Sequence, residues 1–420
     1  MKRFILIIVV GLFAMGSFAY EQAEFLEQFG NRKVVNISIN GLKRTTEKTF
    51  LQWMEIDSGN NVADYDVANI YERISTKKIF TLAKSVEFYP TENEAIMLIT
   101  VGEKFSFFAV PFYNSIDGDK MYGGAALDSN FWGYGGTLLF VGAFGKKDLT
   151  TFVLLSQDEM LNNQYSGKLI VNYNTNEIEM TNLDQDPPYY ESKQKTIKLG
   201  GNLGKKLLDK RLTLGVDLEW QKINIDNKDK LLEEHELDAN FLFPGILINY
   251  DDTKQNFLFR DGFKAESLTS RVFSLDNNYE DFFRSSTQMS YSRTYKSAIN
   301  ISLESSFGLF DRPNLAEEGL SNYYGVKSLP NKNIYADDWI NGALVLEHTI
   351  ISKHKLNPTL SYYYEGGYYH NDGLNEKYHG IGSELKIYFD KVAIPAIGLG
   401  VAYNFTNQQT ILTFNFGMGG

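Results

Sequence analysis

Two different periods of apolar residues divide the chain near residue 104. Up to that point the pattern changes in the order strand, helix, helix, strand, strand. Thr45 or Thr46 can cap the first helix, after a turn signalled by Asn40-Gly41. The second helix is marked by apolar residues that recur on one helical face: Val67, Ile70, Tyr71 and Ile74. Residues 34–104 therefore predict a compact βααββ unit.

From residue 105 to the end, two-residue alternation replaces the helical period. Residues 211–220 are typical, because Leu214, Val216 and Leu218 fall on one face while Asp217 and Glu219 fall on the other. About sixteen such segments follow one another, each of roughly the length at which a tilted strand crosses a bilayer. A soluble β-sandwich also alternates, but charged residues opposite the apolar face suit a wet lumen better. We predict a mainly β fold with a sixteen-stranded antiparallel transmembrane β-barrel over 105–420.

The connections predict an up-and-down order of strands. Short turns such as 208–210 and 353–355 alternate with longer polar loops such as 181–193 and 312–338. In outer-membrane barrels the short turns face the periplasm and the long loops face outward. The first strand would then leave the N-terminal unit on the periplasmic side.

The N-terminus has the pattern of an export signal. Lys2 and Arg3 precede an apolar run over 4–15, and Ala19 ends a stretch of small residues suited to cleavage. We expect a signal peptide at 1–19 and a linker at 20–33, before the unit at 34–104. The expected location is the bacterial outer membrane, with the N-terminal unit in the periplasm.

Composition and motifs argue against several other classes of function. The net charge of -11 disfavours a nucleic-acid surface. None of the five histidines lies at the spacing of a zinc site, and no Gly-x-Ser-x-Gly nucleophile elbow occurs. Asp184 and Asp186 raise the alternative of a calcium loop, but no further acidic ligands follow at the required spacing. We therefore expect no enzymatic activity, no cofactor and no metal.

Several motifs resemble one superfamily when taken in order. The unit at 34–104 looks like a POTRA domain, including its Asn40-Gly41 turn, the step at 78–80 and the closing stretch at 101–103. The segment 128–135 is similar to a junction between early barrel strands. Asp251, Asp252 and the later Gly262 resemble a turn between mid-barrel strands, although its usual Pro is missing. Together they resemble the POTRA-bearing outer-membrane barrels, the BamA/TamA-like insertases and two-partner secretion transporters, over the whole mature chain.

The resemblance also implies a site in the long loop 312–338. In the superfamily this loop folds into the lumen and carries a Val-Arg-Gly-Phe/Tyr tip whose Arg pairs with an acidic residue on a nearby strand. The matching tip here is Val326, Lys327, Ser328 and Leu329, and the acidic partner would be Glu365. Lys carries a point charge in place of the planar Arg fork. The resemblance thus implies a Lys327–Glu365 charge pair as the loop anchor.

The function implied by the resemblance is outer-membrane protein insertion or polypeptide translocation. Extended clients would bind the POTRA-like domain by adding a strand to its sheet, and lipids of the outer membrane would surround the barrel. Two alternatives stay open, a passive pore filled by the long loop and an anchor or display barrel. The N-terminal unit has an alternative role as a simple plug or spacer.

Overall fold

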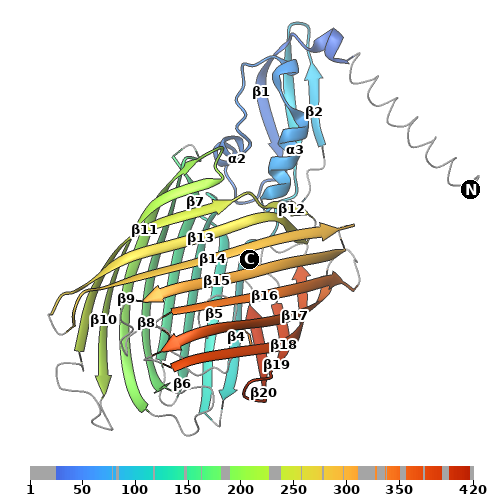
Figure 1. The fold of residues 1–420 in the computed structure, drawn as a ribbon. Coiled ribbons are helices and arrows are strands. Elements are labelled where there is room, and N and C mark those ends of the chain that lie inside the picture. Colours follow the sequence, from blue (N-terminus) through green and yellow to red (C-terminus); the bar gives the residue numbers. More distant parts are fainter. Residues whose placement is uncertain are drawn as a thin grey trace, which may run out of the picture. The chain divides into compact units, whose positions relative to one another are not determined.

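The computed structural model describes residues 25–416, except 78, 82–84, 117–118, 146–148, 162, 181–189, 227–237, 257, 277–278, 297, 311–326, 329–335, 337, 351–355, 372–373 and 390–396. The expected signal peptide at 1–19 lies outside these residues. The chain divides into two compact units, residues 1–104 and 105–420 (Figure 1).

The first unit is a small sheet with helices. Its elements are β1 (Lys33–Asn40), α2 (Glu47–Met54), the 3₁₀ turn η1 (Val62–Asp64), α3 (Val67–Thr76), β2 (Ser85–Pro90) and β3 (Glu94–Thr100). The sheet order is β1-β3-β2, with β1 parallel and β2 antiparallel to β3. Thr46 caps α2 by accepting from the Thr49 N–H, 3.1 Å away. Side chains from the sheet and both helices form the core, including Phe50, Trp53, Ile70, Ile74, Met97 and Ile99.

A buried carboxylate ties the end of this unit to the loop before α2. Glu103 is 4% exposed and accepts from the N–H groups of Lys43 at 2.5 Å, Arg44 at 3.0 Å and Thr45 at 3.1 Å. The Thr45 hydroxyl donates to it as well, at 2.9 Å. Hydrogen bonds to the ionised form offset the cost of burying a charge.

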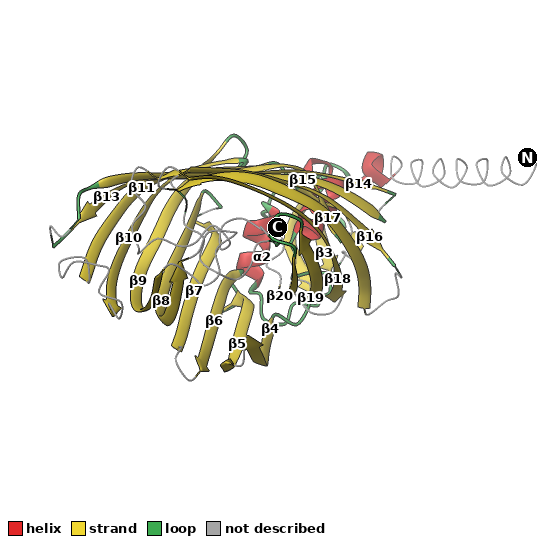
Figure 2. Cartoon of the chain, turned by 60° about the horizontal axis from the view of Figure 1, so that its bottom comes forward, coloured by secondary structure: helices red, strands yellow, loops and turns green. Residues whose placement is uncertain are grey.

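The second unit is a closed antiparallel barrel, so the predicted fold class is confirmed (Figure 2). Sixteen strands form its wall, and the three-residue β12 pairs only with β13. Figure 2 places β13 to β16 along one side and β5 to β8 along the other. The strands are β4 (Phe107–Ile116), β5 (Asp119–Phe131), β6 (Gly136–Gly145), β7 (Leu149–Met160), β8 (Tyr165–Met180), β9 (Tyr190–Leu207), β10 (Leu212–Asp226), β11 (Asp238–Asp251), β12 (Lys254–Asn256), β13 (Phe259–Ser274), β14 (Phe282–Tyr295), β15 (Ile299–Phe310), β16 (Asp338–Thr349), β17 (Leu356–Asn371), β18 (Leu374–Phe389), β19 (Ile397–Asn404) and β20 (Gln409–Phe416).

Alternation along the strands separates an apolar outer face from an inner face that carries most of the buried polar side chains, together with an apolar cluster that includes Ile223, Phe241 and Val272. Val216 on β10 is exposed, and so is Ile246, which lies opposite it on β11. Thr213 and Gln221, which lie on the opposite face of β10 from Val216, are buried and point inward. This pattern is typical of a barrel that crosses a membrane with a polar interior. Among the described residues, no helix combines the length and apolar character needed to span a bilayer.

Candidate functional site

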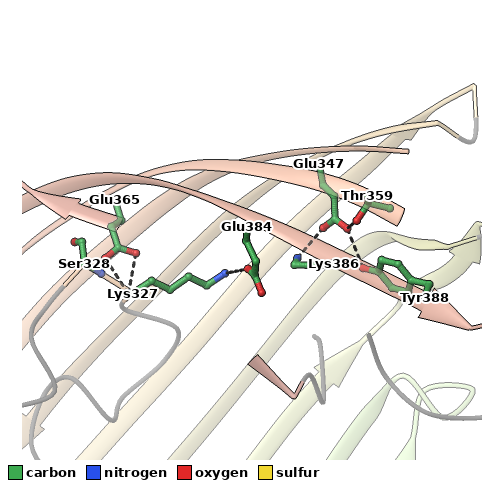
Figure 3. Close-up of polar contacts among 8 residues, drawn as sticks. All are labelled: Lys327, Ser328, Glu347, Thr359, Glu365, Glu384, Lys386 and Tyr388. Atoms are coloured by element: carbon green, nitrogen blue, oxygen red, sulfur yellow. Dashed lines mark hydrogen bonds and ion pairs between the residues drawn. The ribbon is translucent and has the colours of Figure 1, made fainter. Parts of the chain in front are cut away.

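Three glutamates lie on the inner wall where β16, β17 and β18 run side by side. Glu347, Glu365 and Glu384 are all nearly inaccessible to solvent, and each has its own set of donors (Figure 3). Alternation puts them inside, because flanking residues such as Tyr364 and Leu385 are exposed on the outer face. Buried carboxylates need hydrogen bonds or cations to remain ionised. Their partners therefore define what this part of the wall holds.

Glu365 holds the tip of the long loop through its backbone. Its carboxylate accepts from the Lys327 N–H at 2.9 and 3.2 Å and from the Ser328 N–H at 2.6 Å. On the other side, the Asn404 Nδ2 group donates to the Ser328 carbonyl at 2.8 Å. The dipeptide is thus bound by β17 and by β19 at once.

The strand register explains why the tip fits between these two side chains. Glu365, Gly380 and Asn404 lie directly opposite one another on β17, β18 and β19. A Cβ atom added to Gly380 would lie 2.5 Å from both Cβ and Oγ of Ser328. Glycine at this central position leaves the space that Ser328 occupies, with an acceptor on one flank and a donor on the other.

The Lys327 side chain has a different partner from its backbone. Its ammonium lies 3.0 Å from Glu384 Oε2 and 4.9 Å from the centre of the Tyr363 ring. Figure 3 shows the side chain extended between Glu365 and Glu384. The structure therefore brings Lys327 and Glu365 together, as the sequence indicates, but through different atoms. Glu365 binds backbone N–H groups, whereas the charge pair is Lys327–Glu384.

Glu384 is a site residue that the sequence analysis missed. Its position on the polar face of an alternating segment marks it as inward-facing, but many acidic residues share that property. Choosing it requires the register of β17 against β18. In the structure, Gly398 on β19 leaves space for the Glu384 side chain, because an added Cβ there would meet Glu384 Oε1.

Glu347 organises a separate polar cluster on the same inner wall. Its carboxylate accepts from the Thr359 hydroxyl at 2.6 Å, the Tyr388 hydroxyl at 3.0 Å and the Lys386 ammonium at 2.8 Å. The four side chains come from β16, β17 and β18 (Figure 3). Such a set fixes the ring of Tyr388 in position.

The two aspartates of the expected turn motif have separate roles. Asp251 accepts from the N–H and hydroxyl of Thr253 at 2.9 and 2.6 Å, which is a local turn contact. Asp252 reaches across the turn and accepts from the Phe263 N–H at 2.6 Å. Gly262, which precedes Phe263, has φ +127°, and an added Cβ there would lie 2.8 Å from Asp252 Oδ1. All three expected residues therefore meet in one turn.

Other expectations lie outside the described residues. Val326 and Leu329 of the loop tip belong there, as do Lys78 of the N-terminal motif and the candidate calcium loop with Asp184 and Asp186.

Comparison with known proteins gives a result for the fold alone. No family model matches the sequence, and no curated protein matches it. Among solved structures, BamA from Haemophilus ducreyi lacking POTRA domains 1–3 has a TM-score of 0.55 at 12% identity, over 91% of this chain and 85% of that one. CdiB from Escherichia coli has a TM-score of 0.58 at 12% identity, over 92% and 75%. CdiB from Acinetobacter baumannii has a TM-score of 0.57 at 8% identity, over 92% and 73%.

These matches confirm the expected resemblance at the level of fold. Because residues 105–420 make up about three quarters of the chain, a match over 92% has to include part of the first unit as well. The similarity therefore extends beyond the barrel into residues 1–104.

Proposed function

We propose that this protein inserts or translocates polypeptide at the bacterial outer membrane. The similarity to BamA and CdiB across both units is the observation that carries the proposal. The apolar outer face suits a bilayer and the polar interior suits a conduit. In this proposal residues 1–19 direct export, 20–33 are a linker and 34–104 form the periplasmic receptor. We assign no enzymatic role.

Extended client segments would bind the first unit at the outer edge of β2. The order β1-β3-β2 leaves β1 and β2 at the edges of the sheet. The start of β1 is already covered, because the Val34 N–H donates to the Asn60 carbonyl at 2.9 Å. On β2 the Val86 N–H points to the outer edge, where it donates to the Tyr71 hydroxyl at 3.0 Å, so alternation directs the Phe88 N–H to the same edge. A client strand would pair there through its backbone, without requiring a particular sequence.

In the barrel, the proposed task of Lys327, Ser328, Glu365 and Glu384 is to hold the long loop against the lumen wall. Val326 and Leu329 would complete the tip, and the turn of Asp251, Asp252 and Gly262 would order the end of the barrel with short turns. The anchor unites donors and acceptors from three strands with a segment far away in sequence. A loop held in this way is positioned to respond to whatever enters the lumen.

Depletion of the protein tests the proposal. Insertion predicts lower amounts of several outer-membrane proteins by quantitative proteomics, and translocation predicts loss of one secreted client from the medium. Complementation with Glu365→Ala should fail partly, whereas Glu266→Ala, on an exposed residue of β13, serves as the matched control. Unchanged membrane and secreted proteins, with altered uptake of small solutes, would contradict the proposal and favour a passive pore.

A further inference from the structure

The hairpin between β11 and β13 leaves the barrel wall at the end with the short turns. Its β12 strand pairs with β13 alone, through Lys254 opposite Asp261 and Asn256 opposite Phe259. The wall itself is continued by β11, which pairs directly with β13 from residue 264 onward. This hairpin is therefore an extra two-stranded extension, and its direction is set by the turn at Gly262.

Contacts of the hairpin show that it lies inside the barrel. Phe259 is 5% exposed and packs edge-on against Tyr388 of β18, with ring centroids 6.5 Å apart at 81°. The Arg260 carbonyl accepts from Asn300 Nδ2 of β15 at 3.4 Å. Asn300 lies directly opposite the inward-facing Glu347, and the Tyr388 hydroxyl bonds to Glu347. Both contact residues therefore belong to the inner face.

These contacts reach across the barrel opening. Four strands, β14 to β17, lie between β13 and β18 in the wall. Phe259 at the start of β13 nevertheless touches a side chain of β18. A residue that stayed in the wall could not do this, because neighbouring strands are about 4.8 Å apart. The hairpin therefore crosses part of the lumen.

The local backbone fixes this inward direction. Gly262 has φ +127°, a conformation that other residues rarely adopt, and it lies between the hairpin and the regular part of β13. Asp252 spans the bend by accepting from the Phe263 N–H and donating its own N–H to the Phe263 carbonyl at 3.1 Å. The bend is thus a built feature of the turn.

The receiving surface is ordered as well. Glu347 holds the hydroxyl of Tyr388 while it binds Thr359 and Lys386. The ring of Tyr388 is therefore presented to Phe259 in a fixed orientation. This gives the Glu347 cluster a task separate from the loop anchor at Glu365, as the positioning group for the hairpin contact.

We propose that residues 251–256 and 258–262 form a strap that closes part of the lumen by docking Phe259 on Tyr388, and that the strap undocks when polypeptide enters. Among the described residues, the docking contact includes the Phe259–Tyr388 aromatic pair and a long hydrogen bond from Asn300 to the Arg260 carbonyl, and each of these can break without a change in the barrel wall. The role of polypeptide rests on the proposed function, whereas docking of the strap does not.

The absence of cysteine from the chain allows a direct test. Phe259→Cys with Tyr388→Cys, treated with a short cleavable bis-maleimide, should give an intramolecular cross-link in the full-length protein in lipid vesicles. In planar bilayers the cross-linked protein should stay in its lowest conductance state, and cleavage of the linker should restore openings. Tyr250→Cys with Phe263→Cys is the matched control, because these rings lie 6.0 Å apart on neighbouring strands and do not bridge the lumen.

Phe259→Ala should act in the opposite direction and raise the frequency of openings roughly tenfold, because it removes the aromatic contact. Phe259→Leu should fall between this variant and the unmodified protein. The heat-induced gel shift of each variant checks that the barrel is folded. A poor cross-link beside an efficient control, or equal conductance with and without the cross-link, would overturn the strap. Conductance needs no client, so the strap can stand while depletion disproves polypeptide transport, and the reverse also holds.

Discussion

Two buried glutamates, one in each unit, both accept hydrogen bonds from consecutive backbone N–H groups, but they hold different kinds of segment. Glu103 accepts three consecutive backbone N–H groups from residues 43–45, and Glu365 accepts two from residues 327–328. Both carboxylates are at most 4% exposed. At Glu103 the loop leads directly into α2, capped by Thr46. At Glu365 the bound dipeptide belongs to a long loop and carries a cation that binds a second carboxylate, Glu384.

The connection at Glu103 depends on a single carboxylate, whereas the anchor at Glu365 consists of several separate contacts. Glu103 takes backbone groups and the Thr45 hydroxyl, so its loss removes the whole connection at once. The loop tip is instead held by four parts: the Glu365 carboxylate, the space above Gly380 that Ser328 occupies (the Gly380 notch), the Asn404 amide and the Lys327–Glu384 pair. Each part can be removed while the others remain. The anchor is therefore expected to weaken stepwise.

The largest effect is expected for Glu103→Ala. It leaves three N–H groups in a buried site without their acceptor, and we expect a loss of about 4 kcal/mol in the stability of the first unit. Limited proteolysis of the full-length protein at rising denaturant concentration measures this loss, with cleavage mapped to residues 25–104. Glu92→Ala, on an exposed turn, is the control. Equal protection of the two variants would refute the structural role of Glu103.

Glu365→Ala should release the loop tip and leave the strand pairing of the barrel wall intact. Two backbone donors lose a charged acceptor, which corresponds to about 2–3 kcal/mol. The expected readout is faster proteolysis within residues 311–337 at an unchanged temperature of the gel shift. Glu365→Gln keeps one acceptor oxygen, so its rate of loop proteolysis should lie between those of the unmodified protein and Glu365→Ala. If Glu266→Ala gives the same cleavage rate as Glu365→Ala, the tip is not held by Glu365.

Gly380→Ala tests the notch without touching any charge. The new methyl group would lie 2.5 Å from Ser328, so the tip has to shift, at a cost of about 1–3 kcal/mol. Gly342→Ala on β16 is the matched control, because its nearest neighbour would be the Glu304 carbonyl at 3.6 Å. Proteolysis of the loop should increase for the first variant alone. Equal rates for both would show that Ser328 does not depend on the space above Gly380.

The fold could be predicted from the sequence because the spacing of apolar residues within a helix or strand is a local property of the chain. The sequence alone shows the helical face at Ile70 and Ile74 and the alternation along 211–220, because neither pattern depends on which elements pack against it. It also brought Lys327 to Glu365, through the motif resemblance. It could not assign the Lys327 ammonium to Glu384, because that contact depends on the register of β18 against β17, which places Glu384 opposite Ser361 and within reach of the lysine side chain. Nor could it direct the β12 hairpin inward, since this depends on one backbone angle at Gly262.

The smallest effect, and the sharpest separation of the anchor's parts, is expected from Lys327→Met. This change keeps the backbone N–H groups on Glu365 and removes only the ammonium from Glu384, and because the lysine end of this pair is partly exposed we expect the pair to contribute about 1 kcal/mol. In a double-mutant cycle scored by loop proteolysis, Lys327→Met with Glu384→Gln should show a coupling near that value. The cycle with Glu365→Gln should show a smaller one, because Glu365 binds main-chain atoms that the substitution leaves in place. If Glu365 shows the stronger coupling, the charge pair is the one first expected from the sequence, and the contrast with Glu103 reduces to a difference in the length of the loop.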